Sequence, residues 1–77
     1  VKVTPRQCGS IHRLLEEACE TLDLPVPSLF LAQTPIANAF AFGRETPTLV
    51  LQTGLVELLD DDELRAVLAH ELGHVHC

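Results

Sequence analysis

Two histidines near the end of the chain stand four residues apart, and a glutamate directly follows the first. They form the run His70-Glu71-Leu72-Gly73-His74. On an α-helix, this spacing places both imidazoles on one side, close enough to bind one tetrahedral metal ion. The spacing therefore predicts a zinc ion with His70 and His74 as ligands.

The glutamate in this run is placed for proton transfer rather than for binding the metal. Glu71 follows His70 around the helix, so its carboxylate can reach a water bound to the ion. Zinc lowers the pKa of such a water to about 7. Glu71 would accept the proton, the hydroxide would attack a peptide carbonyl, and Glu71 would then protonate the leaving amine. Gly73 costs roughly 1 kcal/mol inside a helix, which indicates a steric requirement beside the imidazoles.

Both remaining histidines and the last cysteine are also candidate metal ligands. His76 points about 120° or more away from the metal side, and His12 lies near the start of another helix, so both are expected to be ordinary polar residues. Cys77 returns to the metal side, where it packs beside the site or acts as an adventitious ligand. A metal-storage or sensing module built from His70, His74, His76 and Cys77 is an alternative, which the orientation of His76 disfavours.

The helix that carries the run is expected to begin at Asp60. The Asp60 side chain can cap the first turn, and Glu63 completes a capping box three residues later. At about 100° per residue, His70 and His74 lie beside the apolar stripe of this helix rather than on it. The helix thus has a core face and an adjacent face with two imidazoles. The stripe consists of Leu64, Val67, Leu68, Leu72 and Val75.

An amphipathic helix is also expected near the start of the chain. Thr4, followed by Pro5 and Gln7, predicts its N-cap, and a start at Ser10 is the alternative. Pro25 predicts its end, because the residue before a proline avoids helical geometry. The apolar residues of this helix recur with a helical period: Ile11, Leu14, Leu15, Ala18, Cys19 and Leu22.

Between the two helices the pattern changes to that of short strands. Phe40 and Phe42 alternate with Ala39 and Ala41, which predicts that the two pairs face opposite sides of a sheet. The second and third strands are expected to be antiparallel. Thr53 is expected to cap a short helix after the third strand. The predicted strands cover residues 28–32, 38–43 and 48–52, and the short helix residues 54–59.

The composition restricts the class of protein. Of the 77 residues 47% are hydrophobic, which is enough for a core. The net charge is −6 with only five Lys and Arg residues, which argues against a nucleic-acid partner. Three cysteines without a C-x-x-C pair do not form a disulfide framework and fit a reducing compartment. The chain ends three residues after the run, so we expect residues 1–77 to be the N-terminal part of a longer catalytic domain.

The chain from Asn38 onward resembles the HtpX-like and CAAX-prenyl-protease-related family of membrane zinc metallopeptidases. The resemblance is strongest in the run that contains both histidines, and it extends back to the segment before the first strand. Its end, His74-Val75-His76-Cys77, is similar to members from cyanobacteria and plastids. The matching segments are residues 22–25, 38–43, 49–51, 53–55, 62–64 and 66–74, with Pro47.

The resemblance implies a gluzincin, with a glutamate from a later helix as the third zinc ligand. It implies that an edge strand holds the substrate backbone through Asn38, Ala39, Phe40 and Ala41. It also implies a membrane-anchored parent whose catalytic domain faces the cytosol and cleaves proteins, such as damaged membrane proteins. The third ligand lies beyond Cys77, so the 77-residue chain alone is expected to be soluble, to hold zinc weakly and to hydrolyse nothing.

These observations predict an α+β, zincin-like half-domain. A small antiparallel sheet is expected to pack between the N-terminal helix and the C-terminal helix that carries the histidines. The predicted activity of the parent is that of a zinc metalloendopeptidase. The alternative is a non-catalytic metal-binding or interaction domain that retains the fold, and Glu71 argues against it because a purely structural helix does not need this carboxylate.

Overall fold

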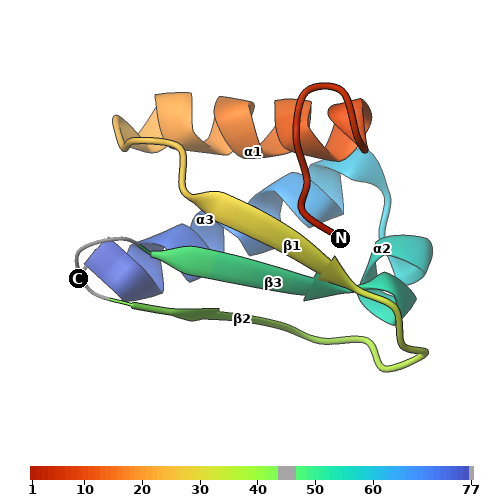
Figure 1. Ribbon diagram of the computed structural model, residues 1–77. Helices are drawn as coiled ribbons and strands as arrows, with labels where there is room; N and C mark the ends of the chain where they lie inside the picture. Colours follow the sequence, from red (N-terminus) through yellow and green to blue (C-terminus); the bar gives the residue numbers. More distant parts are fainter. Residues whose placement is uncertain (44–46, 77) are drawn as a thin grey trace.

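The computed structural model describes residues 1–43 and 47–76, and the side chains of these residues up to position 74. The chain forms one helix, then three strands, then two further helices, which is the predicted order, and the predicted α+β class is confirmed (Figure 1). The elements are α1 (Gly9–Leu22), β1 (Ser28–Ala32), β2 (Ala39–Phe42), β3 (Thr48–Gln52), α2 (Thr53–Leu58) and α3 (Asp61–His76).

The three strands form one mixed sheet in the order β1-β3-β2. β2 and β3 are antiparallel, as predicted, with Phe40 opposite Val50. β1 is parallel to β3, with Leu29 opposite Leu49. The expectation of a wholly antiparallel sheet was therefore wrong. After β1 the chain forms β2 at the opposite edge of the sheet. It then turns back as β3, which lies between β1 and β2 and therefore runs in the same direction as β1.

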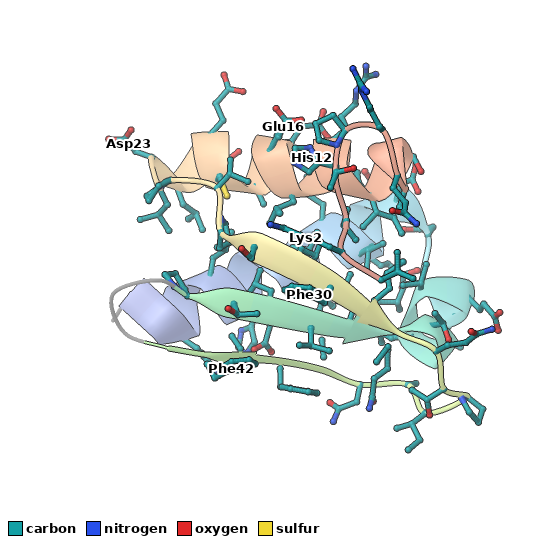
Figure 2. The ribbon with its side chains drawn as sticks, viewed as in Figure 1. Lys2, His12, Glu16, Asp23, Phe30 and Phe42 are labelled. Atoms are coloured by element: carbon teal, nitrogen blue, oxygen red, sulfur yellow. The ribbon has the colours of Figure 1, made fainter. Side chains whose placement is uncertain are left out.

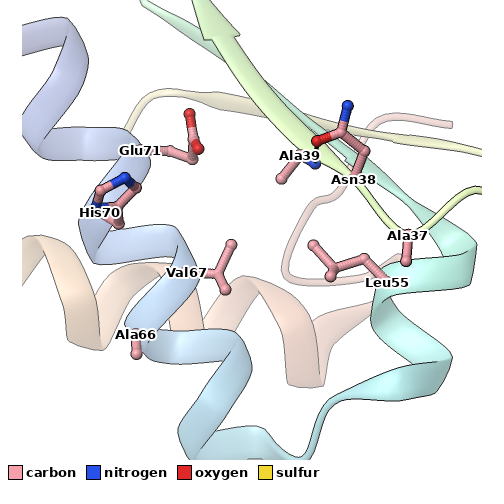
Figure 3. A pocket seen from close by; sticks show the side chains of 8 residues that line it. All are labelled: Ala37, Asn38, Ala39, Leu55, Ala66, Val67, His70 and Glu71. Atoms are coloured by element: carbon pink, nitrogen blue, oxygen red, sulfur yellow. Dashed lines mark hydrogen bonds between the residues drawn. The ribbon is translucent and has the colours of Figure 1, made fainter.

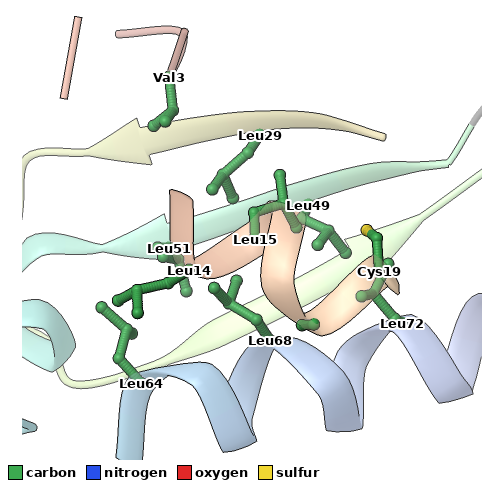
Figure 4. Packing of buried hydrophobic residues seen from close by; sticks show 11 residues of the cluster. Val3, Leu14, Leu15, Cys19, Leu29, Leu49, Leu51, Leu64, Leu68 and Leu72 are labelled. Atoms are coloured by element: carbon green, nitrogen blue, oxygen red, sulfur yellow. The ribbon is translucent and has the colours of Figure 1, made fainter. Parts of the chain in front are cut away.

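Both long helices pack on the same face of the sheet, so the expected arrangement with the sheet between them was wrong. The reason is the alternation of leucines along β1 and β3, which directs all of the buried ones to one face (Figure 4). α1 and α3 meet over this face and also pack against each other. The core consists of Val3, Leu14, Leu15, Ala18, Cys19, Leu29, Leu49, Leu51, Leu64, Leu68 and Leu72.

The opposite face of the sheet carries phenylalanines. Phe30, Phe40 and Phe42 are exposed, and the rings of Phe40 and Phe42 stack with centroids 6.5 Å apart. Figure 2 labels Phe30 on β1 and Phe42 on β2. Ala39 and Ala41 are half-buried and pack against the core on the helical side. The predicted alternation of β2 is therefore confirmed, because its alanines and phenylalanines lie on opposite faces.

The first three residues cover the outer edge of β1. The Val3 amide donates to the Leu29 carbonyl at 2.7 Å, and the Leu31 amide donates to the Val1 carbonyl at 2.7 Å. The Val3 side chain enters the core and is 3% exposed. β2 forms the other edge of the sheet, and no second strand pairs with it within the described ranges. The prediction that this segment is an edge strand is therefore confirmed.

The N-termini of the two long helices are built differently. Thr4 and Gln7 form a separate turn, so the predicted cap at Thr4 was wrong, and α1 begins at Gly9. Its N-cap, Cys8, has a left-handed conformation (φ 61°) and no side-chain capping bond. At α3 the predicted capping box is confirmed. The Glu63 amide donates to Asp60 Oδ1 at 2.8 Å, and the Asp60 amide donates to Glu63 Oε1 at 3.0 Å.

The C-terminus of α1 and its polar surface follow simple local rules. Asp23 is left-handed, and the amides of Asp23 and Leu24 donate back to carbonyls in the last helical turn, as in a Schellman motif. His12 contacts Glu16 at 2.8 Å, which fits its expected role as an ordinary polar residue. None of the helices in the described part of the chain has the length and apolar character that a membrane span requires.

Candidate active site

α3 carries two functional faces next to each other. Leu68 and Leu72 are fully buried against the sheet and α1, which fixes the rotation of the helix about its axis. His70 and His74 lie exposed on the adjacent side, with ring centroids 4.4 Å apart and ring planes tilted by 55°. Glu71 is half-buried between these faces. The helical phase that the sequence predicted is thus the phase that the structure has.

The open edge of the sheet lies beside this helix. β2 packs against α3, and the start of β2 lies near His70 and Glu71. A pocket of about 370 Å³ lies between them, and Figure 3 shows Glu71 extending from α3 toward Asn38 and Ala39. The pocket is lined by Ala37, Asn38, Ala39, Leu55, Ala66, Val67, His70 and Glu71.

The residues expected to bind substrate lie in different environments. Asn38 and Ala39 line the pocket together with His70 and Glu71. The Phe40 side chain points to the opposite face of the sheet, so only its backbone is on the strand beside the pocket. Ala41 follows on the helical side of β2 and packs against the core without lining the pocket.

The backbone amides and carbonyls of β2 form two sets: an inner set that points toward β3, and an outer set that points to the open edge of the sheet. The Gln52 amide donates to the Asn38 carbonyl at 3.0 Å, which makes this a hydrogen-bonded pair of the antiparallel ladder. Such pairs alternate with pairs that do not bond across the ladder. By this alternation the backbone groups of Phe40 point toward β3, and those of Ala39 and Ala41 point to the open edge. The Ala39 amide donates to Asn38 Oδ1 at 2.9 Å, which leaves the Ala41 amide and both carbonyls for an added strand.

The donor atoms fit a zinc site in part. Two exposed imidazoles on adjacent turns can converge on one ion, and they account for two of the three protein ligands that catalytic zinc sites use. The described residues contain no group of three or more His, Cys, Asp or Glu side chains that could hold a metal. Cys77 lies outside the described residues, and so does the His76 side chain. The described residues thus supply two of the three protein ligands that such a site uses.

Sequence reasoning missed the contacts that shape the pocket. Thr53 was expected to cap α2, but Gln52 is the N-cap, and the Thr53 hydroxyl instead bonds both to the amide and to the carbonyl of Thr34, each at 3.0 Å. The Gly54 amide also donates to the Thr34 carbonyl at 2.9 Å. A Cβ atom at Gly54 would lie 2.3 Å from the Pro35 carbonyl oxygen. The adjacent threonine and glycine were the only signal of this close approach.

Known proteins are similar to this chain in sequence over almost all of its length. Residues 5–77 match the peptidase family M48. The chain is 46% identical over 79 aligned residues to the plastoglobule-localized metallopeptidase 48, chloroplastic, of Arabidopsis thaliana, an alignment that covers 100% of this chain and 23% of that protein. It is 45% identical to a protease HtpX homolog of Moorella thermoacetica, covering 96% of this chain and 25% of the relative.

A third relative has a similar coverage. The protease HtpX homolog 2 of Methanosarcina mazei is 40% identical over 95% of this chain and 26% of its own length. The chain thus spans 23–26% of the length of these three relatives. The resemblance to the HtpX-like family is confirmed, and the match over nearly the whole chain shows that it belongs to peptidase family M48.

Proposed function

We propose that this chain is the N-terminal part of the catalytic domain of a zinc-dependent metalloendopeptidase. The observation that carries the proposal is the position of the His70 and His74 imidazoles on one side of α3, with Glu71 directed into the pocket at the open sheet edge. His70 and His74 would hold the zinc ion. Zinc, when bound, supplies a Lewis acid that polarises the peptide carbonyl and acidifies a water molecule.

Glu71 would move the proton in this reaction. Its carboxylate adjoins the ligands without facing the same direction, so it accepts a proton from the attacking water and delivers it to the nitrogen of the leaving amine. The half-buried position of Glu71 restricts its side chain to the vicinity of the pocket. One residue therefore acts as base and then as acid during cleavage of one peptide bond.

The substrate would bind as an extended strand along β2. The Ala41 amide and the carbonyls of Ala39 and Ala41 point to the open edge, which is the pattern that an added antiparallel strand requires. The segment from Asn38 to Ala41 would thereby align the peptide with Glu71. A protein or peptide substrate fits this mode, because recognition through the backbone does not depend on a particular sequence.

The remaining parts of the catalytic domain belong to the whole protein. A third zinc ligand, a membrane anchor and a catalytic domain on the cytoplasmic side are proposals that rest on the family, since the curated relatives are about four times longer. With two ligands, the 77-residue chain alone would hold zinc weakly and hydrolyse nothing. Calorimetric zinc titration of this chain tests that point, and nanomolar affinity with chelator-sensitive proteolysis would refute it.

The central test is a Glu71→Gln variant of the longer protein. Loss of the general base is expected to lower the rate of hydrolysis of a protein substrate such as casein by about 10²- to 10⁴-fold. Zinc content should remain that of the wild type, because Glu71 is not a ligand. Glu57→Gln, at an exposed position on α2, is the matched control and should leave both values unchanged.

A second variant separates the metal ligands from the base. The double change His70→Ala with His74→Ala should abolish zinc binding as well as hydrolysis. Equal zinc content in this variant and the wild type would disprove the ligand assignment. Bound zinc together with hydrolysis that does not depend on Glu71 would disprove the mechanism and would fit a non-catalytic metal-binding domain instead.

A further inference from the structure

We propose that Thr53 is a positioning residue, whose hydroxyl holds the connection between β1 and β2 so that the open edge of β2 is in place before a peptide binds. The inference rests on the proposed function, because β2 is the strand that would receive the peptide. Thr53 does not line the pocket beside Glu71, and it acts through the connection, which consists of residues 33–38.

The connection belongs to no helix or strand, so its position depends on contacts with other segments. Figure 1 shows it curving beside α2 before the chain enters β2. Within the described residues, the hydrogen bonds that tie residues 34–38 to distant segments all go to the stretch where β3 passes into α2. This stretch consists of Gln52, Thr53 and Gly54. Three consecutive residues thus determine where the connection lies.

The Thr53 hydroxyl bonds to both backbone groups of one residue in the connection. It accepts a hydrogen bond from the Thr34 amide and donates one to the Thr34 carbonyl, each at 3.0 Å and partly buried. The same carbonyl also accepts from the Gly54 amide at 2.9 Å, which uses both of its lone pairs. A side chain must be donor and acceptor at once to make the two Thr53 bonds, so a valine of the same shape makes neither.

Glycine at the next position allows the two backbones to approach each other. A Cβ atom at Gly54 would lie 2.3 Å from the Pro35 carbonyl oxygen and 2.6 Å from that of Ile36. The connection therefore has no space to move closer to the start of α2. The bonds of the Thr53 hydroxyl oppose movement in the other direction, away from α2.

The anchored connection ends at residues that lie next to the candidate catalytic groups. Ala37 and Asn38 line the pocket beside Glu71. The Asn38 carbonyl accepts from the Gln52 amide at 3.0 Å, which is the last anchor before β2. The outward-pointing backbone groups of β2 begin at the following residue, Ala39. Loss of the hydroxyl bonds would therefore let the start of the open edge occupy several positions.

An edge that is held in place binds a peptide without first having to be ordered. If the arrangement that binds the peptide is populated only in part, the apparent Kd rises in proportion to the lost population. Once a peptide is bound, its bonds to β2 keep the strand in this arrangement, so its alignment with Glu71 is recovered. The Thr53 hydroxyl should therefore affect Kd and KM rather than kcat.

Thr53→Val and Thr53→Ser in the longer protein test the role of the hydroxyl. The Kd of fluorescein-labelled casein, measured by fluorescence anisotropy in the Glu71→Gln background, does not depend on hydrolysis. Thr53→Val is expected to raise this Kd about tenfold through loss of two hydrogen bonds, and Thr53→Ser should stay within about twofold of the background. With Glu71 intact, Thr53→Val should raise KM for casein by the same factor and leave kcat unchanged. Partial unfolding would instead lower the apparent kcat and leave KM unchanged.

Thr21→Val is the matched control for the change from threonine to valine. The Thr21 hydroxyl donates to the Glu17 carbonyl at 3.0 Å on the exposed surface of α1. This variant loses a hydroxyl hydrogen bond to the backbone, as Thr53→Val does, but it should leave the Kd and KM for casein unchanged.

Gly54→Ala displaces the same connection by a different route. The added Cβ atom would meet the Pro35 carbonyl, so the Kd for casein should rise here as well. Gly9→Ala is its control, because a Cβ atom at Gly9 meets no other atom within 4 Å. If Thr53→Val does not fold, the comparison of Gly54→Ala with Gly9→Ala decides the question.

Hydrogen exchange followed by mass spectrometry checks that the effect passes through the connection. In Thr53→Val the Thr34 amide loses its acceptor, so residues 33–38 should exchange about tenfold faster or more. The strands β1 and β3 should exchange at the rate of the parent protein, which would show that the sheet itself is intact.

The outcomes distinguish this inference from the proposed function. Equal Kd values for Thr53→Val and Thr53→Ser would overturn the inference even if the wild type is a protease. Faster exchange of residues 33–38 without a change in Kd would also overturn it, because the hydroxyl would then serve the fold alone. A Kd that follows the presence of the hydroxyl would support the inference even if the wild type hydrolyses no casein, and only the proposed catalytic activity would then fail.

Discussion

The two edges of the sheet differ in whether another segment of the described chain covers them. The edge of β1 is covered by residues 1–3, which bond to its backbone and place Val3 in the core. The edge of β2 has no such partner among the described residues, and α3 lies beside it with its histidines exposed. An uncovered edge is an aggregation hazard, which proteins usually avoid by covering it or by using it. Here the uncovered edge is the one next to the candidate catalytic groups.

The largest effect is expected at the covered edge. Val3→Asp would bury an unpaired carboxylate in the core, so the free energy of unfolding should fall by about 4 kcal/mol. Urea unfolding followed by circular dichroism measures this. Val1→Asp is the control at a position that is 65% exposed, and it should have an effect below about 0.5 kcal/mol. Similar small effects at both positions would show that residues 1–3 do not seal this edge.

Two proline substitutions on neighbouring residues probe the open edge. Phe40→Pro removes an amide that points toward β3, so it should destabilise the fold by about 3 kcal/mol. Ala41→Pro removes an amide that points to the open edge, so it should cost less than about 1.5 kcal/mol. The same Ala41→Pro change should weaken peptide binding about tenfold through loss of one donor. The reverse order of stabilities would mean that the inner and outer backbone groups of β2 are assigned the wrong way round.

A smaller effect on stability is expected at the N-terminus of α3, the helix that lies beside the open edge. Asp60→Ala removes the carboxylate that accepts a hydrogen bond from the Glu63 amide in the α3 capping box. The free energy of unfolding should fall by about 1 kcal/mol. Ser10→Ala, in the first turn of α1, is the comparison, because no capping bond from a side chain starts that helix. Its effect should be below about 0.5 kcal/mol, and urea unfolding of both variants measures the difference. An equal loss in both variants would contradict the difference between the two N-termini.

The smallest effect is expected at the ion pair that joins the two helices. Arg65 of α3 contacts Glu17 of α1 at 3.2 Å and Asp62 at 3.0 Å, and all three side chains are exposed to solvent. Arg65→Met should lower the unfolding temperature slightly at low ionic strength and not at all near 1 M salt, where exposed charges are screened. A large loss that persists at high salt would show that Arg65 contributes through packing instead.

The sequence alone predicted the parts of this molecule that depend on local periodicity. The phase of His70 and His74 follows from the burial of Leu68 and Leu72, and the capping box at Asp60 needs only its neighbour Glu63. The opposite orientations of Ala39 and Phe40 follow from the period of a strand. Such features involve residues within a few positions of each other, so a pattern of residue types determines them.

The features that the sequence did not reveal depend on contacts between distant segments. Nothing in Leu29 or Leu49 indicates that their strands are parallel neighbours, because both strands have the same leucine-rich pattern in either direction. The left-handed conformation of Cys8 was not foreseen, since cysteine has no preference for it. The close approach at Gly54 depends on Pro35, which lies on the connection before β2 and belongs to no regular element.

The strand order also leads to an expected order of events in folding. β3 is central in the sheet but is the last of the three strands to leave the ribosome, so β1 and β2 have no common partner until it has been made. The β2–β3 hairpin joins residues that are close in the chain and carries the smaller entropic cost of loop closure, whereas the parallel β1–β3 contacts join more distant ones. The hairpin should therefore nucleate the sheet, and pulse-labelled hydrogen exchange should find its amides protected before those of β1.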